Sequence, residues 1–281
     1  MSDALVIARL ALQEAVRRRV LAVVGVLTAL SGVLYVVGCV SLKNNIDSAL
    51  QVGGGIIKPI VPATLLGLAS FGTLFLGSVL AVFLTAGAVR GDVDRGLVQP
   101  LVVRPVGRGA YLAGRALAAM VVSGGYVAVI SILATVTTRA LFSLTPPDAW
   151  QSIPRLVAAV VVVTTLTLLV SCVLSTVATG ISVLMAYGAG LVAGLLGEIG
   201  RAFHATTVTD IADSVAYLLP FEALYRDALS RLSPEGPLGQ LVQLGPLGGA
   251  RAGGVGLWLF VVAYVVGCLL LARWLFGRSD L

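Results

Sequence analysis

The stretch LVAAVVVVTTLTLLVSCVLSTVATGISVLMAYGAGLVAGLLG, from Leu156 to Gly197, has 42 residues and no charged side chain. As a single α-helix it would be about 63 Å long, roughly twice the thickness of the hydrocarbon core of a bilayer. It must therefore fold back as two membrane-spanning helices. Glycine permits a chain reversal and hydroxyl groups can satisfy freed backbone groups, so we expect the turn at Thr179-Gly180-Ile181-Ser182.

Four further apolar runs are each long enough to cross a bilayer, which takes about 20 residues. They cover residues 20–40, 60–89, 110–136 and 255–276. The divided stretch adds spans at about 156–179 and 181–198. The sequence therefore predicts an all-α polytopic membrane protein with six transmembrane helices, built as a single transmembrane domain over residues 1–281.

The composition supports lipid as the surrounding solvent. Of the 281 residues, 58% are hydrophobic and 11% are charged, whereas about a quarter of the residues of a soluble domain are charged. The net charge of +6 could suggest nucleic acid as a partner. Because the basic residues flank the apolar runs and do not form one patch, we expect a lipid bilayer and no nucleic acid.

Charge counting gives the orientation. The N-terminal segment, residues 90–115 and the C-terminal tail together carry 11 basic and five acidic residues. The segments on the other side, residues 41–59, 137–155 and 198–254, carry eight of each. The positive-inside rule therefore predicts cytoplasmic N- and C-termini in the cell inner (cytoplasmic) membrane.

An amphipathic interface helix is expected over residues 1–19, lying along the membrane surface. Its apolar face consists of Leu5, Ala8, Leu12 and Val16, and its predicted membrane-interface anchors are Arg9, Arg17, Arg18 and Arg19. The three consecutive arginines would meet lipid phosphates at the entrance to the first span. A topology anchor and a contact with a partner protein are equally compatible with this cluster.

The outer loop, residues 199–254, contains two short amphipathic stretches. The first places Ile211, Val215 and Leu218 on one face, and the second places Phe221, Leu224, Ala228 and Leu232 on one face. We expect both to form short helices at the outer membrane surface. Pairs four residues apart, Glu222 with Arg226 and Asp227 with Arg231, would brace the second helix.

Several kinds of chemistry lack their residues. A phosphate-binding loop needs Lys followed by Ser or Thr, but Lys43 precedes Asn and Lys58 precedes Pro. With one histidine, His204, and three dispersed cysteines, neither a metal site nor a Cys/His nucleophile has enough members. The sequence therefore predicts no ATPase activity, no metal and no catalytic residue in this chain.

The span centres also lack ionisable residues, which argues against an ion-coupled carrier. The fourth span is rich in hydroxyl groups, and two interpretations of them stay open. They could line a polar path, or they could bond back to their own helix or a neighbour. These residues are Thr164, Thr165, Thr167, Ser171, Ser175, Thr176 and Thr179.

The connection between the second and third spans, residues 90–108, reads RGDVDRGLVQPLVVRPVGR. Two acidic residues begin a short amphipathic segment, and Arg104-Pro105 ends it before a basic re-entry into the membrane. Its apolar face must be covered by the membrane or by a partner protein.

This connection resembles the coupling region of type-2 ATP-binding-cassette (ABC) exporter permeases. In that family, two acidic residues and a glycine lead through apolar residues to Arg-Pro-Val-x-Arg and Leu-x-Gly-Lys/Arg. The matching positions here are Asp92, Asp94, Gly96, Leu101, Arg104, Pro105, Val106, Arg108, Leu112, Gly114 and Arg115. Asp stands where the family usually has Glu at both acidic positions, and Leu97 stands where Thr is common. The resemblance implies that ATPase coupling depends on Asp92, Asp94, Gly96, Leu97, Leu101, Arg104, Pro105 and Arg108.

The resemblance also implies a dimer of two six-span subunits, either a homodimer or a heterodimer. Each subunit would bind a separate cytoplasmic ABC ATPase that carries the ATP and Mg, so this chain itself would bind no cofactor. The expected activity is export by alternating access, or mechanical work on a periplasmic partner. The short layout resembles the subgroup that includes the permease for nitrous oxide reductase maturation.

Two other classes of function are alternatives to an ABC permease. An ATP-independent secondary carrier or channel would need coupling-ion ligands or broken helices near mid-membrane, and neither is visible. A membrane-embedded enzyme acting on lipid would need a carboxylate or histidine cluster at a span end. Asp92 and Asp94 are the single candidate pair for it, and they lack a third ligand.

Overall fold

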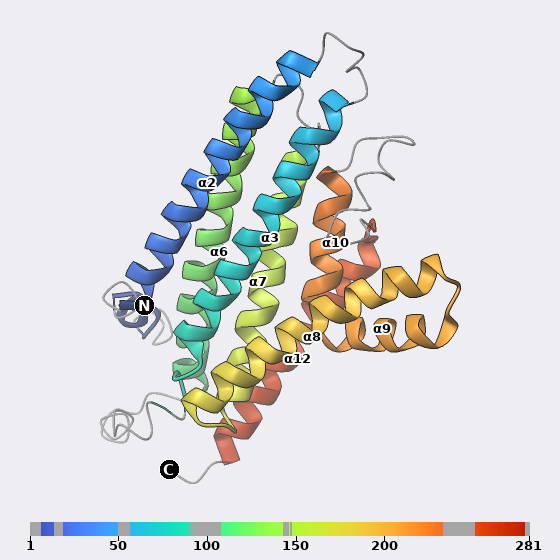
Figure 1. Ribbon diagram of the computed structural model, residues 1–281. Coiled ribbons are helices and arrows are strands. Elements are labelled where there is room, and N and C mark those ends of the chain that lie inside the picture. Colours follow the sequence, from blue (N-terminus) through green and yellow to red (C-terminus); the bar gives the residue numbers. More distant parts are fainter. Residues whose placement is uncertain are drawn as a thin grey trace.

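A computed structural model shows a bundle of long helices (Figure 1). It describes residues 7–13, 19–49, 57–89, 91, 108–142, 146, 148–232 and 251–278. Within them the secondary structure is helical, with six helices long and apolar enough to cross a membrane. These are α2 (Arg19–Ala49), α3 (Ile57–Thr85), α6 (Arg108–Leu141), α7 (Ala149–Ser171), α8 (Thr176–Ala202) and α12 (Val255–Arg278). The prediction of an all-α protein with six candidate transmembrane helices is confirmed.

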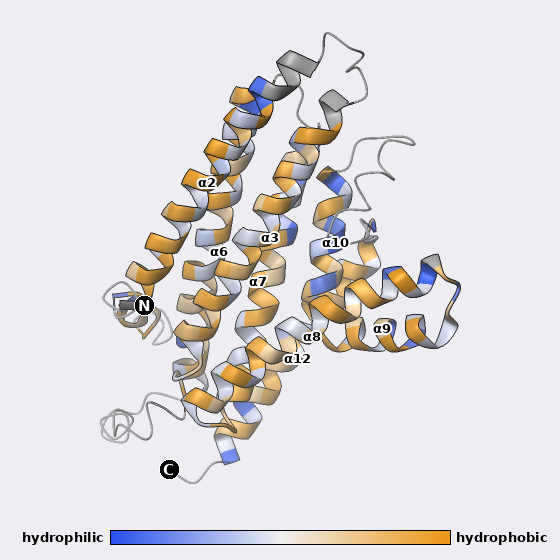
Figure 2. Cartoon of the chain, viewed as in Figure 1, coloured by the Kyte–Doolittle hydropathy of each residue, from blue (hydrophilic) through white to orange (hydrophobic). Residues whose placement is uncertain are grey.

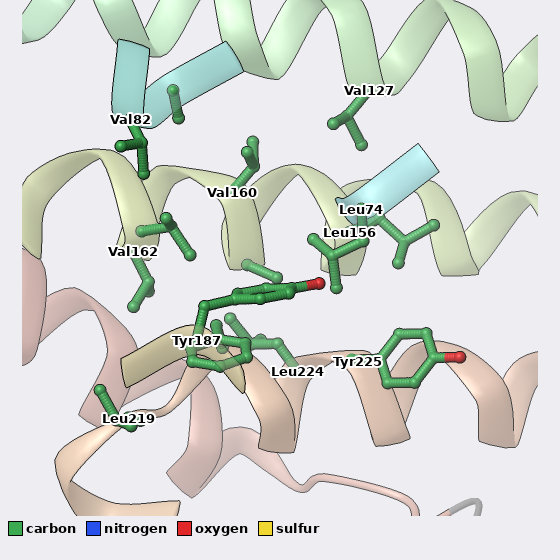
Figure 3. Close-up of a cluster of buried hydrophobic side chains, with 14 of the residues drawn as sticks. Leu74, Val82, Val127, Leu156, Val160, Val162, Tyr187, Leu219, Leu224 and Tyr225 are labelled. Carbon is green, nitrogen blue, oxygen red and sulfur yellow. The ribbon is translucent and has the colours of Figure 1, made fainter. Parts of the chain in front are cut away.

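Helix α7 forms the centre of the bundle. It packs against α3, α6 and α12, and also against the short helix α10 (Phe221–Leu232). Its buried apolar side chains include Leu156 and Val160, which share one core with Leu74 of α3, Val127 of α6 and Leu224 of α10 (Figure 3). The first part of the uncharged stretch from Leu156 to Gly197 thus supplies the central helix of the fold.

The outer surface of the bundle is apolar, as the orange outer faces of α2, α8 and α12 show (Figure 2). Val26 of α2 is 68% exposed, Met185 of α8 70% and Leu259 of α12 68%. Large apolar side chains on several sides of a bundle require a lipid environment, because water would penalise their exposure. The chain is therefore an integral membrane protein.

The ends of the helices fall into two groups (Figure 1). The beginning of α2, the end of α3, the beginning of α6, the α7–α8 turn and the end of α12 lie at one end, which we name the loop end. The end of α2, the beginning of α3 and the end of α6 lie at the opposite end. The regions that charge counting assigns to one side of the membrane therefore flank the same end of the bundle.

The predicted turn at Thr179-Gly180-Ile181-Ser182 is wrong. Those residues lie inside α8, and the helix break falls at residues 172–175. The predicted fourth span begins after Arg155, because the uncharged stretch begins there and charged residues are costly inside a membrane. The structure begins α7 at Ala149 and tolerates Arg155 in the helix, because Asp227 neutralises it at 2.6 Å. A span of 23 residues from Ala149 therefore ends at Ser171.

The helices differ from the other predicted span limits at several ends. Helix α2 continues to Ala49 and α6 to Leu141, beyond the predicted ends at 40 and 136. Helix α3 ends at Thr85, before the predicted 89, and residues 86–89 form turns.

The hydroxyl groups of the fourth span bond back to backbone carbonyls of their own helix. Thr164 donates to the Val160 carbonyl at 2.7 Å, Thr167 to the Val163 carbonyl at 2.7 Å, and Ser171 to the Leu168 carbonyl at 2.7 Å. Thr164 also lies 3.2 Å from the Ser123 hydroxyl of α6. The structure thus favours helix packing over a polar path for these residues.

The structure describes a short part of the segment for which an interface helix is predicted. Residues 7–13 are helical, with Ala8 and Ala11 buried against Ala118 of α6 and Arg9 exposed. The exposed fraction of Leu12, expected on the buried face, is 36%. Arg19 begins α2, whereas Leu5, Val16, Arg17 and Arg18 lie outside the described residues.

Candidate functional site

The predicted coupling segment falls largely outside the described residues. Arg108 is the first residue of α6. The other predicted coupling residues, Asp92, Asp94, Gly96, Leu97, Leu101, Arg104 and Pro105, lie outside the part of the chain that the structure describes. The structure does describe how the two ends of this segment are held.

A set of buried side chains, which we name the loop-end cluster, holds both ends of the segment. Tyr111 of α6 donates a hydrogen bond to the carbonyl of Ala88, just after α3, at 3.3 Å. The Tyr111 ring lies 6.3 Å, centroid to centroid, from Phe276 of α12. The complete cluster is Ala88, Val89, Tyr111, Leu112, Ala116, Leu168, Ala272 and Phe276. The segment thus leaves and re-enters the bundle at one packed site formed with α7 and α12.

Two glycines mark where the segment ends touch other helices. A Cβ atom on Gly91 would lie 2.6 Å from the Thr176 hydroxyl at the start of α8. A Cβ atom on Gly109 would lie 3.2 Å from Nε of Arg273 on α12. Both distances are too short for an undisturbed Cβ contact. The segment ends therefore lie in close contact with α8 and α12, so a displacement of the ends toward these helices would press on them.

A second constellation lies toward the opposite end of the bundle. Two adjacent residues of α10, Arg226 and Asp227, are buried and point to different partners. Asp227 is 0% exposed and accepts a hydrogen bond from Arg155 of α7 at 2.6 Å. It also accepts one from the backbone N–H of Gly253 at 3.0 Å. Asp227 therefore ties α10 to α7 and to the residues before α12.

Arg226 ties the same helix to α8. Its guanidinium contacts Glu198 of α8 at 2.7 Å and pairs with Glu222 one turn earlier in α10. It also donates to the Gly194 carbonyl of α8. We name Arg155, Glu198, Glu222, Arg226 and Asp227 the buried charge cluster.

Burial shapes the electrostatics of this cluster. Removing a charge from water is costly unless a partner and hydrogen bonds compensate for it. Burial raises the pKa of the Glu222 carboxyl above its ordinary value, and the adjacent Arg226 guanidinium opposes that rise. The arrangement is therefore suited to holding α7, α8 and α10 in one relative position.

Sequence reasoning missed this cluster. It expected α10 at the outer membrane surface, but Phe221, Leu224 and Ala228 are buried and α10 packs against α7 and α3 (Figure 1). The predicted Glu222–Arg226 pair is present. The predicted pair of Asp227 with Arg231 is wrong, because Asp227 bonds Arg155 and Arg231 lies 3.9 Å from Asp148.

The described residues contain no group of three or more His, Cys, Asp or Glu side chains that could hold a metal ion. The three cysteines, Cys39, Cys172 and Cys268, are free thiols. His204 is exposed in the short connection between α8 and α9 (Thr206–Leu218), with a φ of 55°.

Six apolar spans, with α7 at their centre and the short helix α10 held inside by ion pairs, define a polytopic α-helical membrane protein. The sequence model of the family described as ABC-2 family transporter protein matches residues 5–281. The chain belongs to this family and is a membrane permease subunit of an ABC transporter, the transmembrane component and not the ATPase. The family implies a cytoplasmic ATPase as its partner. A search of curated protein sequences found no match.

Proposed function

We propose that this chain is the permease of an ATP-driven exporter and that residues 90–108 receive the movement of a separate cytoplasmic ATPase. The proposal places the loop end and both termini in the cytoplasm of a cell with an inner membrane. ATP and Mg belong to the partner ATPase. A second copy of the permease completes the transporter, and a periplasmic partner is compatible with this arrangement.

The observation that carries this proposal is the direct contact of the segment ends with two spanning helices. Gly91 abuts Thr176, the first residue of α8, and Gly109 abuts Arg273 of α12. Helix α8 has 27 residues, which corresponds to a rod of about 40 Å. If α8 moves as a rigid helix, a displacement of Thr176 therefore also moves Glu198 near its other end.

At that other end, Glu198 pairs with Arg226 of α10. Tilting α8 would pull on this pair, while Asp227 holds the same short helix to α7 through Arg155. The buried charge cluster is thus placed to open or stay closed according to the relative position of α7 and α8. This arrangement supports alternating access, in which movement at the loop end is converted into separation of helices at the opposite end.

The test is co-expression with the cognate ATPase of a charge-swapped variant, Asp92→Lys with Arg104→Glu. We expect loss of the permease–ATPase complex on size-exclusion chromatography and loss of transport-coupled ATP turnover. A matched control makes the same exchange at exposed residues elsewhere, Asp210→Lys with Arg139→Glu. Assembly and coupled turnover unchanged in the first variant would overturn the proposal.

The alternative, an ATP-independent carrier or channel, gains one observation from the structure. Buried carboxyl groups at Glu222 and Asp227 are the kind of residue that ion-coupled carriers use. Both carboxyl groups are engaged by arginines, however. Transport by the purified chain alone, driven by an ion gradient in proteoliposomes, would establish this alternative.

A further inference from the structure

A pocket of about 260 Å³ lies where α9, the beginning of α10 and the beginning of α12 meet. Its wall includes the charged residues Asp213, Glu222, Arg226 and Arg251 and the aromatic residues Tyr217 and Phe260. The contact between α9 and α12 frames it, because the Tyr264 hydroxyl donates to the Leu218 carbonyl at 3.0 Å. The pocket is large enough for a small polar group of several heavy atoms.

The two arginines of the pocket wall, Arg226 and Arg251, differ in their partners. Arg226 is already neutralised by Glu198 and Glu222. Arg251 is exposed, and in the part of the chain that the structure describes no carboxylate forms an ion pair with it. Its backbone N–H donates to the Arg226 carbonyl at 3.3 Å, which fixes Arg251 at the pocket. An anionic group is therefore the complementary ligand for this guanidinium.

The position of the pocket identifies the source of that anionic group. The apolar span of α12 begins at Val255, four residues after Arg251. The arginine therefore flanks a membrane-spanning segment, the place where basic side chains meet lipid headgroups. Tyr217 and Phe260 meet edge to face with ring centroids 6.1 Å apart, as aromatic residues at a membrane interface do. Exposed Leu218 and Leu259 continue an apolar surface beside the pocket.

The negative charge of Asp213 in the pocket wall limits which lipid headgroups can bind. Asp213 is 53% exposed in its side chain and lies 3.6 Å from Arg201, a distance that leaves carboxylate oxygens open to another donor. A headgroup with phosphate and a primary ammonium group can satisfy both Arg251 and Asp213. A purely anionic headgroup would meet Asp213 with like charge.

We infer that this pocket binds an aminophospholipid of the leaflet opposite the loop end, with its phosphate on Arg251 and its ammonium group toward Asp213. The lipid then holds α9 and α12 together beside the buried charge cluster. This site is independent of the proposed coupling to an ATPase.

The experiment measures lipid binding by the full chain in detergent with native mass spectrometry. Phosphatidylethanolamine, phosphatidylcholine, phosphatidylglycerol and inorganic phosphate are titrated separately. Phosphatidylethanolamine should bind most tightly, and Arg251→Gln should weaken it about tenfold, as expected for loss of one charge-assisted contact. The matched control, Arg139→Gln, removes an exposed arginine from the last turn of α6 and should leave the affinity unchanged.

A second variant tests the ammonium contact. Asp213→Asn should reduce the preference for phosphatidylethanolamine over phosphatidylglycerol. Both lipids should still bind, because Arg251 still contacts the lipid phosphate. Equal loss of affinity in Arg251→Gln and Arg139→Gln would overturn the inference, as would no loss in either. Binding of inorganic phosphate with the affinity of the lipid would also overturn it, since the site would then serve a free anion.

Discussion

Removing the Asp227 carboxylate is the sharpest perturbation of the buried charge cluster. In Asp227→Ala, the Arg155 guanidinium would stay in a site where its side chain is 10% exposed, without its partner at 2.6 Å. Breaking one side of a buried ion pair typically costs about 3–5 kcal/mol, because an uncompensated charge is left in a low dielectric. That range includes the cost of losing the hydrogen bond that the Gly253 N–H donates to Asp227 at 3.0 Å.

The assay is unfolding of the detergent-solubilised chain in increasing denaturant, followed by tryptophan fluorescence. Asp227→Ala should lower the free energy of unfolding by about 3–5 kcal/mol. The control, Asp210→Ala, removes an exposed carboxylate from the neighbouring helix α9 and should change it by less than about 0.5 kcal/mol.

A double variant separates the pair from the individual side chains. Arg155→Met with Asp227→Leu removes both charges and keeps the volume, so it should cost much less than Asp227→Ala alone. If Asp227→Ala were as mild as Asp210→Ala, the assignment of a buried ion pair that fastens α10 to α7 would be refuted.

Three further predictions concern the loop end, the packing and the pH dependence. Gly91→Ala places a methyl group 2.6 Å from the Thr176 hydroxyl, so transport-coupled ATP turnover should fall. Adding Thr176→Ala removes the clashing oxygen and should restore the turnover. Failure of this rescue would contradict a direct contact between Gly91 and Thr176. Ser123→Ala removes the 3.2 Å contact with the Thr164 hydroxyl between α6 and α7 and the hydrogen bond that Ser123 donates to the Ala119 carbonyl within α6 at 2.8 Å. We expect it to lower the free energy of unfolding by about 0.6 kcal/mol, and a loss above about 2 kcal/mol would contradict a role of Ser123 in helix packing alone. Burial raises the pKa of the Glu222 carboxyl in the folded chain above its ordinary value of 4.5. The folded chain therefore holds the carboxyl proton more tightly than the unfolded chain, and the free energy of unfolding should fall as the pH rises above 4.5. Unfolding curves at a series of pH values should show a shallower fall for Glu222→Gln than for the unchanged chain, and equal slopes would contradict a raised pKa of Glu222.

The sequence predicted the spans because their signal is local. An apolar run of about 20 residues has one stable environment, so six such runs required six helices in lipid. The same logic failed at Arg155, where the partner Asp227 is 72 residues away in the chain and no local pattern announces it. That single unseen pair moved the predicted fourth span and its turn by several residues.

The place of α10 was also beyond sequence reasoning. Its alternating charges at Glu222, Arg226, Asp227 and Arg231 fit both a helix exposed to water and one whose charges are paired inside the protein. Deciding between them requires knowing that Arg155 and Glu198 face it. For the coupling segment, the sequence was informative about its residues, which resemble a family pattern. The contacts of the segment ends with Thr176 and Arg273 became visible in the structure alone.

The most direct test of the central claim is a photo-crosslinking measurement on the assembled transporter. A photoreactive amino acid replaces Leu101 in the middle of the coupling segment, and in a control it replaces Arg139 at the end of α6 remote from that segment. We expect a covalent adduct between the Leu101 position and the cytoplasmic ATPase, with none from the Arg139 position. An intact complex in which the Leu101 position fails to crosslink to the ATPase, or in which both positions crosslink equally, would contradict it.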